Sequence, residues 1–194
     1  MPHIQLEDSQ RPGIGGLLAF RPGPARPLLD LAEVLLRKAS PLTPGERELI
    51  VALVSSRNDC QWSKRAHGAF AAAQLPGGRD LVDAVCHDPE SAPVPEKLKS
   101  LLQLAAAVTE GGKAVKPEHV DRARAAGADD VEIHDTVLVA AAFCMFNRYV
   151  SGLATSVPDD PAVYESLAET LLSSDYRTLG GYPRQAADPS SGAS

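Results

Sequence analysis

Aromatic residues are scarce in this sequence and make up 5% of its 194 residues. Runs of Ile, Val, Thr and Tyr, which favour strands, are scarce as well, whereas Ala, Leu and Val supply most of the apolar content. This composition argues against a strand-rich protein and favours helices. A chain of this length can bury one core without disulfide or metal staples, so a single globular domain is expected.

Cysteine is also rare. The chain has three cysteines, and this small, odd number argues against a disulfide framework and leaves reduced thiols available for chemistry. Cys86 is followed by His87, but no further ligands stand at metal-binding spacing, so no metal site is predicted. We interpret Cys86 and Cys144 as structural residues.

A concentration of basic charge is missing too. The net charge is −6, and Lys and Arg are scattered among acidic residues, so the electrostatic footprint of a nucleic-acid-binding protein is absent. The longest apolar run, Val137 to Phe146, has ten residues and is far shorter than the ~20 that cross a bilayer. The first residues carry no basic patch followed by an apolar stretch, so no secretory signal is predicted. We therefore expect a cytoplasmic protein that binds neither nucleic acid nor membrane.

Helical spacing of apolar residues begins near residue 29 and predicts an all-α domain of about seven or eight helices over residues 29 to 173. The Pro- and Gly-rich residues 1 to 28 are expected to form an extended arm, and residues 174 to 194 a flexible tail. The helices are predicted at about 29–38, 44–54, 60–75, 80–86, 95–109, 117–126, 130–153 and 161–173.

Two helix starts bear on the candidate site. Thr43 and Glu46 have the spacing of a capping box, with Pro44 at the first helical position. Residues 55 to 59 then interrupt the apolar pattern. A new helix is expected to begin there, with Cys60 in its first turn.

On that helix, Cys60, Ser63 and His67 share one face. His67 lies two turns, about 10 Å, beyond Cys60, so a proton path between them would pass through the Ser63 hydroxyl or a water. A cysteine in the first turn faces unpaired backbone N–H groups, which favour the nucleophilic thiolate. Glu48, on the preceding helix, can fold back to hold the His67 ring or act as a general base.

Each of these residues also has a plainer interpretation. Cys60 alone would be a small buried hydrophobe, His67 a partly buried histidine and Glu48 a solvated carboxylate. Trp62, the only tryptophan, is expected to serve in packing or as the wall of a cavity. The common register of Glu48, Cys60 and His67 favours a site over these alternatives.

The same spacing recurs within the predicted helix 130–153. The recurrence is either a coincidence between two Ala-rich segments or the trace of two related helical hairpins. The residues in register are Glu132, Cys144, Asn147 and Ser151.

A specific family resemblance rests on this stretch. The alkylhydroperoxidase D-like family carries a glutamate, eleven residues, and then Cys-x-x-Cys-x-x-x-His, which Glu48, Cys60 and His67 match, while Ser63 replaces the second cysteine. The segments LTPGERELIVALVSS and IHDTVLVAAAFCMFNRYVSGLA resemble the subgroup called peroxidase-related, and the likeness covers about residues 25 to 157. The chain is identified as a member of the carboxymuconolactone decarboxylase and alkylhydroperoxidase D-like superfamily. The resemblance implies a homo-oligomer, commonly a trimer or hexamer, and neither metal nor organic cofactor.

The resemblance implies a thiol oxidoreductase that acts on hydroperoxides. Cys60 would be the nucleophile, Glu48 and His67 the proton relay, Ser63 a relay or placeholder, and an external thiol the reductant, because a serine cannot close a disulfide. Two alternatives stay open: a cofactor-free lyase like the family's lactone decarboxylases, in which His67 and Glu48 act without Cys60, and a non-catalytic oligomeric protein. Ser63 is either natural or an engineered replacement of cysteine.

Overall fold

The computed structural model describes residues 1–6 and 11–181, which contain ten α-helices, one short 3-10 helix and no strand. The all-α fold is thus confirmed, with more helices than expected. In chain order the elements are α1 (Ile14–Phe20), α2 (Pro22–Arg37), α3 (Pro44–Arg57), α4 (Gln61–Ala72), α5 (Gly78–His87), α6 (Glu96–Glu110), η1 (Gly112–Ala114), α7 (Pro117–Ala125), α8 (Asp130–Gly152), α9 (Pro161–Ser173) and α10 (Tyr176–Leu179).

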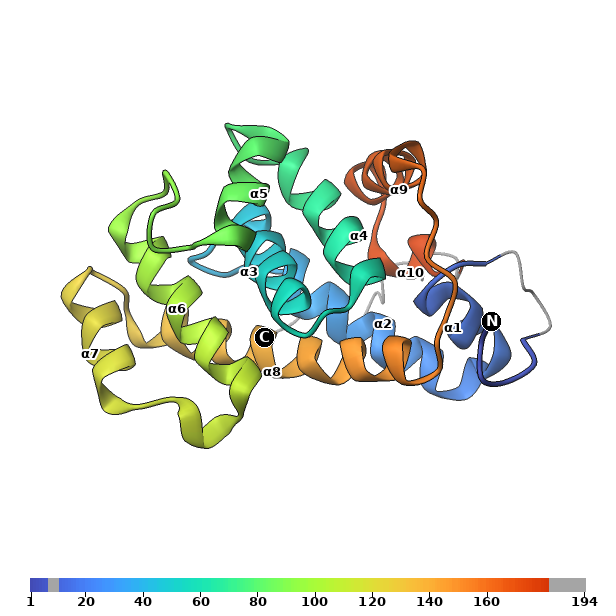
Figure 1. Ribbon diagram of the computed structural model, residues 1–194, viewed down its shortest axis with the longest axis horizontal. Helices are drawn as coiled ribbons and strands as arrows, with labels where there is room; N and C mark the ends of the chain where they lie inside the picture. The colour runs from blue at the N-terminus through green and yellow to red at the C-terminus, as the bar shows by residue number, and fades with distance from the viewer. Residues whose placement is uncertain (7–10, 182–194) are drawn as a thin grey trace, which may run out of the picture.

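Helix α3 is the centre of the core. Ten of its 14 residues are buried, and it packs against α4, α5, α6 and α8. Residues Leu49 to Val54 of α3 are apolar on every side of the helix, as suits a helix surrounded by others. Helix α8 runs along the long axis of the molecule, with α6 and α7 near one end and α1, α2 and α10 near the other (Figure 1). The first and the last of the described helices therefore lie at the same end of the bundle.

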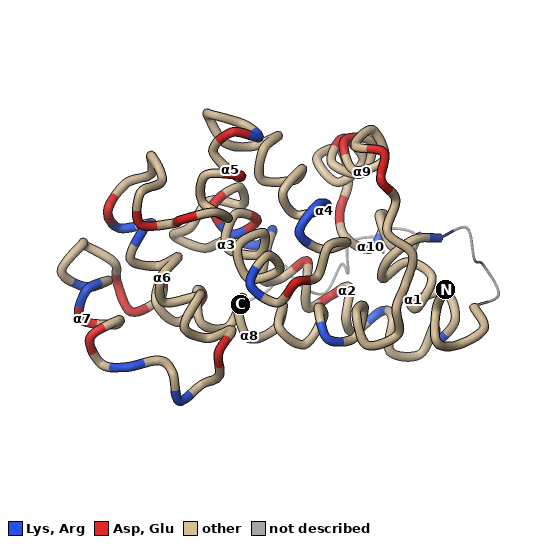
Figure 2. Tube along the Cα trace, in the orientation of Figure 1, with Lys and Arg blue, Asp and Glu red and all other residues tan. Residues whose placement is uncertain are grey.

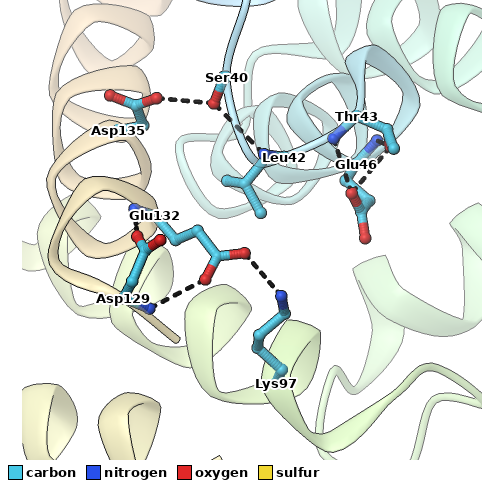
Figure 3. A network of polar contacts seen from close by, with 8 residues as sticks. All are labelled: Ser40, Leu42, Thr43, Glu46, Lys97, Asp129, Glu132 and Asp135. Atoms are coloured by element: carbon cyan, nitrogen blue, oxygen red, sulfur yellow. Dashed lines mark hydrogen bonds and ion pairs between the residues drawn. The ribbon is translucent and has the colours of Figure 1, made fainter. Parts of the chain in front are cut away.

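Side-chain hydrogen bonds fix the starts of α3 and α8 (Figure 3). The predicted capping box is confirmed: the backbone N–H of Thr43 donates to Glu46 at 2.8 Å, and the Glu46 N–H donates to the Thr43 hydroxyl at 3.3 Å. Asp129 and Glu132 form the same arrangement at the start of α8. Lys97 of α6 donates to Glu132 at 2.6 Å and so ties α6 to α8.

The predicted extended arm is wrong for residues 14 to 28, which belong to α1 and the start of α2. Pro22 stands at the first position of α2, where its missing N–H costs nothing, and Pro27 is accommodated inside the helix. One face of α2 is buried and consists of Ala25, Leu29, Ala32 and Leu36. That face has helical spacing, but the density of proline concealed it.

The predicted flexible tail is also wrong for its first residues. Residues 176 to 179 form α10, which packs against α2 and α9, and Tyr176 is buried. Asp175 caps this short helix by accepting from the Thr178 N–H at 2.8 Å. The rest of the predicted tail, residues 182 to 194, lies outside the described residues.

Charges of both signs are interspersed over most of the trace (Figure 2). Helix α9 differs, because its charged residues, Glu165 and Glu169, are both acidic. Among the described residues, no helix combines the length and the apolar character needed to cross a bilayer.

Candidate functional site

The turn between α3 and α4 brings Glu48 and His67 together. Asp59 adopts a left-handed conformation, with φ of 52°, and the Cys60 N–H donates to the Ser55 carbonyl at 2.9 Å. The chain thereby reverses within three residues, and α4 runs back along α3. Nδ1 of His67 lies 2.7 Å from Oε2 of Glu48.

Glu48 has a second partner that the sequence did not predict. The phenol of Tyr176, delivered by α10, donates to Oε1 of Glu48 at 2.6 Å. Glu48 is fully buried, and a buried carboxylate needs hydrogen-bond partners. Its two oxygens have them in Tyr176 and His67. The one feature of the sequence that could have indicated α10 is Asp175 as a helix cap, and the four residues that follow are too few to predict a helix.

Each of the two hydrogen bonds that link Tyr176, Glu48 and His67 has a defined donor and acceptor. Burial raises the pKa of the Tyr176 phenol well above its ordinary value, and the Glu48 carboxylate adds to the effect. Tyr176 is therefore a hydrogen-bond donor throughout the physiological pH range. A carboxylate only accepts, so Nδ1 of His67 carries the proton of this bond, and Nε2 is the nitrogen that a ligand can use.

Aromatic rings hold the His67 ring in place. Phe70 and Phe143 meet it edge-on, with ring centroids 5.3 Å and 4.8 Å away, and Tyr176 stacks at 6.4 Å. Such contacts limit ring rotation, which is what a proton-transfer group requires.

Two cavities open beside His67. A main cavity of about 750 Å³ is bounded by α1, α2, α4, α9 and α10. An inner cavity of about 60 Å³ is bounded by α1, α2, α4, α8 and α10. Trp62 lines both cavities, as expected for a wall residue, and so do His67 and Tyr176. The two cavities are therefore adjacent and share part of their lining.

The structure separates Ser63 from Cys60. Ser63 is buried and lines the inner cavity together with His67. Cys60 is 1% exposed and lines neither cavity. It stands at the N-cap of α4, one residue before the helix and not in its first turn, and its thiol accepts no capping hydrogen bond. Among these described side chains, the thiol has no hydrogen bond to Glu48, Ser63 or His67.

Polar side chains connect the turn between α3 and α4 to helix α8. The Ser55 hydroxyl donates to Oδ1 of Asn147 at 3.2 Å, and Nδ2 of Asn58 lies 3.3 Å from the Cys144 sulfur. These contacts attach the turn to α8. Helix α8 is continuous from Asp130 to Gly152, so the recurrence of the site spacing in it does not correspond to a second helical hairpin, and that hypothesis is wrong.

Within the described residues, no group of three or more His, Cys, Asp or Glu side chains is arranged to hold a metal ion. The polar side chains that line the two cavities are those of Arg11, Trp62, Ser63, His67, Asp160, Ser166 and Tyr176. What they can do chemically is accept and donate protons.

Two solved structures have the same fold. One is an uncharacterized peroxidase-related protein from Silicibacter sp. TM1040, with a TM-score of 0.71 and 28% identity over 79% of this chain and 78% of that chain. The other, from Ralstonia eutropha JMP134, is described as an alkylhydroperoxidase AhpD core and an uncharacterized peroxidase-related protein. It has a TM-score of 0.70 and 26% identity over 79% of each chain. These neighbours define the class as the all-helical alkylhydroperoxidase D-like fold.

The model of the carboxymuconolactone decarboxylase family matches residues 80 to 155. No curated protein matches the sequence. Together, the family match and the structural neighbours show that the chain belongs to the carboxymuconolactone decarboxylase and alkylhydroperoxidase D-like superfamily. The matched residues span α5 to α8 and do not include Glu48, Cys60, Ser63 or His67, so the family match says nothing about these four side chains.

Proposed function

We propose that this protein is an acid–base enzyme that uses His67 to move a proton on a small molecule bound in the main cavity. The observation that carries the proposal is the buried chain Tyr176–Glu48–His67, which ends on a cavity that the Cys60 thiol does not line. Glu48 orients the ring and stabilises it when it becomes an imidazolium. Nε2 takes a proton from the substrate and returns it at another atom.

The chemistry this arrangement serves best is proton transfer at a carbon next to a carbonyl group, as in a lyase or isomerase acting on a lactone or ketone. The Ser63 hydroxyl would donate to the carbonyl oxygen as negative charge develops on it, which is supported by the presence of both Ser63 and His67 in the lining of the inner cavity. This is the acid–base alternative that the family resemblance left open.

The proposal is tested with single-turnover and steady-state assays on a panel of lactones and ketones. Activity should fall by about a hundredfold or more in His67→Gln, because a positioned general base contributes about 10²–10⁴-fold. Cys60→Ala is the matched control and should keep at least half of the wild-type rate. Equal activity of His67→Gln and wild type would contradict the proposal.

A second candidate is the hydroperoxide reduction that Cys60 would perform. It is favoured by the position of Cys60 at the N-cap of α4, since the positive end of a helix dipole favours a thiolate, and by the peroxidase-related neighbours. The thiolate would attack the peroxide oxygen, releasing an alcohol and leaving a sulfenic acid. Two external thiols would then return Cys60 to the thiol, with loss of water and formation of their disulfide.

This candidate predicts the opposite mutational pattern. Consumption of cumene hydroperoxide with dithiothreitol would vanish in Cys60→Ala, and peptide mass spectrometry would find Cys60 oxidised after peroxide treatment. An unmodified Cys60 after exposure to excess peroxide rules the candidate out. The same variants thus decide between the two functions.

We further propose that the protein forms a homo-oligomer through α8. Val131, Leu138 and Met145 recur every seven residues on this helix and are 52%, 40% and 45% exposed. An apolar stripe with this spacing is suited to packing against a helix of a second copy. Light scattering after gel filtration should give a multimer for the wild type and a smaller species for Leu138→Glu, whereas the control Leu172→Glu, exposed on α9, should leave the mass unchanged.

A further inference from the structure

The two cavities differ in the size and chemistry of what they can hold. The main cavity has mostly apolar walls, including Leu18, Leu29, Phe70 and Leu167, and its volume of about 750 Å³ is within the range of small-molecule sites. The inner cavity, at about 60 Å³, has room for a head group of a few atoms, since one water occupies about 30 Å³ in the liquid. The combination suits a ligand with an apolar body and one small polar end.

Charge limits the nature of that polar end. The side chains with polar groups that line the inner cavity are Trp62, Ser63, His67 and Tyr176. The indole N–H of Trp62 can only donate, and the Tyr176 hydroxyl is committed to Glu48. Glu48 is a fully buried carboxylate directly behind the His67 ring. A second negative charge at this depth would face Glu48 across a single imidazole ring in an apolar surrounding, which is costly.

A positive head group is disfavoured for a different reason. His67 and Ser63 are the two groups available to it, and the one carboxylate in reach already accepts from two donors. An uncharged oxygen, in contrast, can accept from the Ser63 hydroxyl and lie against Nε2 of His67. The main cavity is also lined by two exposed charged side chains, Arg11 and Asp160. Their charges are solvated by water, unlike a charge in the inner cavity.

We infer that the site takes a medium-length alkyl or aromatic molecule with one small, neutral oxygen group, the body in the main cavity and the oxygen in the inner one. Such a molecule would be the substrate of the proposed enzyme, and its conversion rests on the proposed function. Binding itself does not depend on turnover, so the two can fail separately.

Trp62 provides a direct readout. It is the only tryptophan of the chain and lines both cavities, so its emission reports occupancy without a label. We would titrate the protein with 1-hexanol, 1-octanol and 1-decanol, and then with octanoate and octylammonium. Each added methylene should tighten binding about fourfold, as expected for about 0.8 kcal/mol per buried CH₂. Octanoate and octylammonium should bind at least about tenfold more weakly than 1-octanol.

A matched pair of variants locates the binding. Leu167→Asn changes the wall of the main cavity and should weaken binding of 1-decanol at least tenfold, whereas Leu172→Asn, exposed on the same helix, should leave it unchanged. Circular dichroism checks that both variants are folded. An affinity independent of chain length, octanoate binding as tightly as 1-octanol, or equal binding by both variants would overturn the inference. A protein that binds 1-decanol in this pattern but turns over no lactone or ketone would refute the proposed function alone.

Discussion

The phenol of Tyr176 donates a 2.6 Å hydrogen bond to the carboxylate of Glu48, although 128 residues separate them in the sequence. The bond joins the last helix described, α10, to the centre of the core. Helix α10 is itself fixed on α2, because Arg177 pairs with Asp30 and the Tyr176 N–H donates to Glu33 at 3.2 Å. The C-terminal part of the chain is thus a component of the site.

Replacing Tyr176 with phenylalanine should loosen the site without unfolding the protein. Phe fills the same space but leaves Oε1 of Glu48 without its donor, so the position of the His67 ring becomes less defined. We expect about a tenfold fall in turnover with little change in binding of 1-decanol. In a Glu48→Gln background the same change should have a smaller effect, because the two act through one chain. Additive losses in the double variant would contradict a shared chain.

Tyr176 should also make the protein sensitive to alkaline pH. Its pKa is raised by burial in the folded state, so the folded protein keeps a proton that the unfolded chain loses above about pH 10. This contribution to stability is complete below pH 10 and declines as the pH rises above it, by up to about 1.4 kcal/mol per pH unit. Urea unfolding between pH 9 and 11 should therefore show a steeper loss of free energy for wild type than for Tyr176→Phe. Parallel pH profiles would refute the prediction.

Gly13 should control the shape of the cavity through Trp62. Its φ is +59°, which disfavours other residues, and a Cβ at this position would lie 2.0 Å from Cε2 of Trp62. Gly13→Ala must therefore displace the indole or the chain before α1. We expect a shift of the Trp62 emission maximum and at least about a tenfold weaker binding of 1-decanol. Gly23→Ala is the control, because no atom lies within 4 Å of its added Cβ.

A cysteine at position 63 should be more reactive than the natural Cys60. Ser63 lines the inner cavity, whereas Cys60 lines neither cavity and is 1% exposed. In a Cys60→Ala background, Ser63→Cys should react with iodoacetamide at least about tenfold faster than Cys60 does in the wild type. Mass spectrometry identifies the alkylated residue in each protein. Faster labelling of Cys60 would instead support hydroperoxide reduction by Cys60.

The sequence predicted the helical domain well because its apolar spacing and capping signals are local. The capping box of Thr43 and Glu46, and the helix that begins after Asp129, were both found from a few neighbouring residues. The pairing of Glu48 with His67 was also within reach, because the interrupted pattern at residues 55 to 59 implied a turn between two helices.

The parts that escaped prediction depend on contacts between distant residues. The proline content of residues 1 to 28 outweighed the buried face of α2, and α10 is too short to stand out before it packs on α2. The apolar pattern predicted the continuous helix that α8 forms, but the repeated site spacing within it could not be distinguished from chance without the structure. Nor could the pattern show that the thiol at position 60 lies off the cavity, since that depends on α1, α9 and α10.

In the proposed mechanism, Glu48 fixes the proton of His67 on Nδ1 and leaves Nε2 as the base at the cavity. Long-range ¹H–¹⁵N NMR of the imidazole rings measures this directly, with His67→Gln used to assign the His67 signals among those of the five histidines. When the His67 ring carries a single proton, we expect that proton on Nδ1, and we expect this preference to weaken in Glu48→Gln. A His67 ring protonated on Nε2 in the wild type would contradict it.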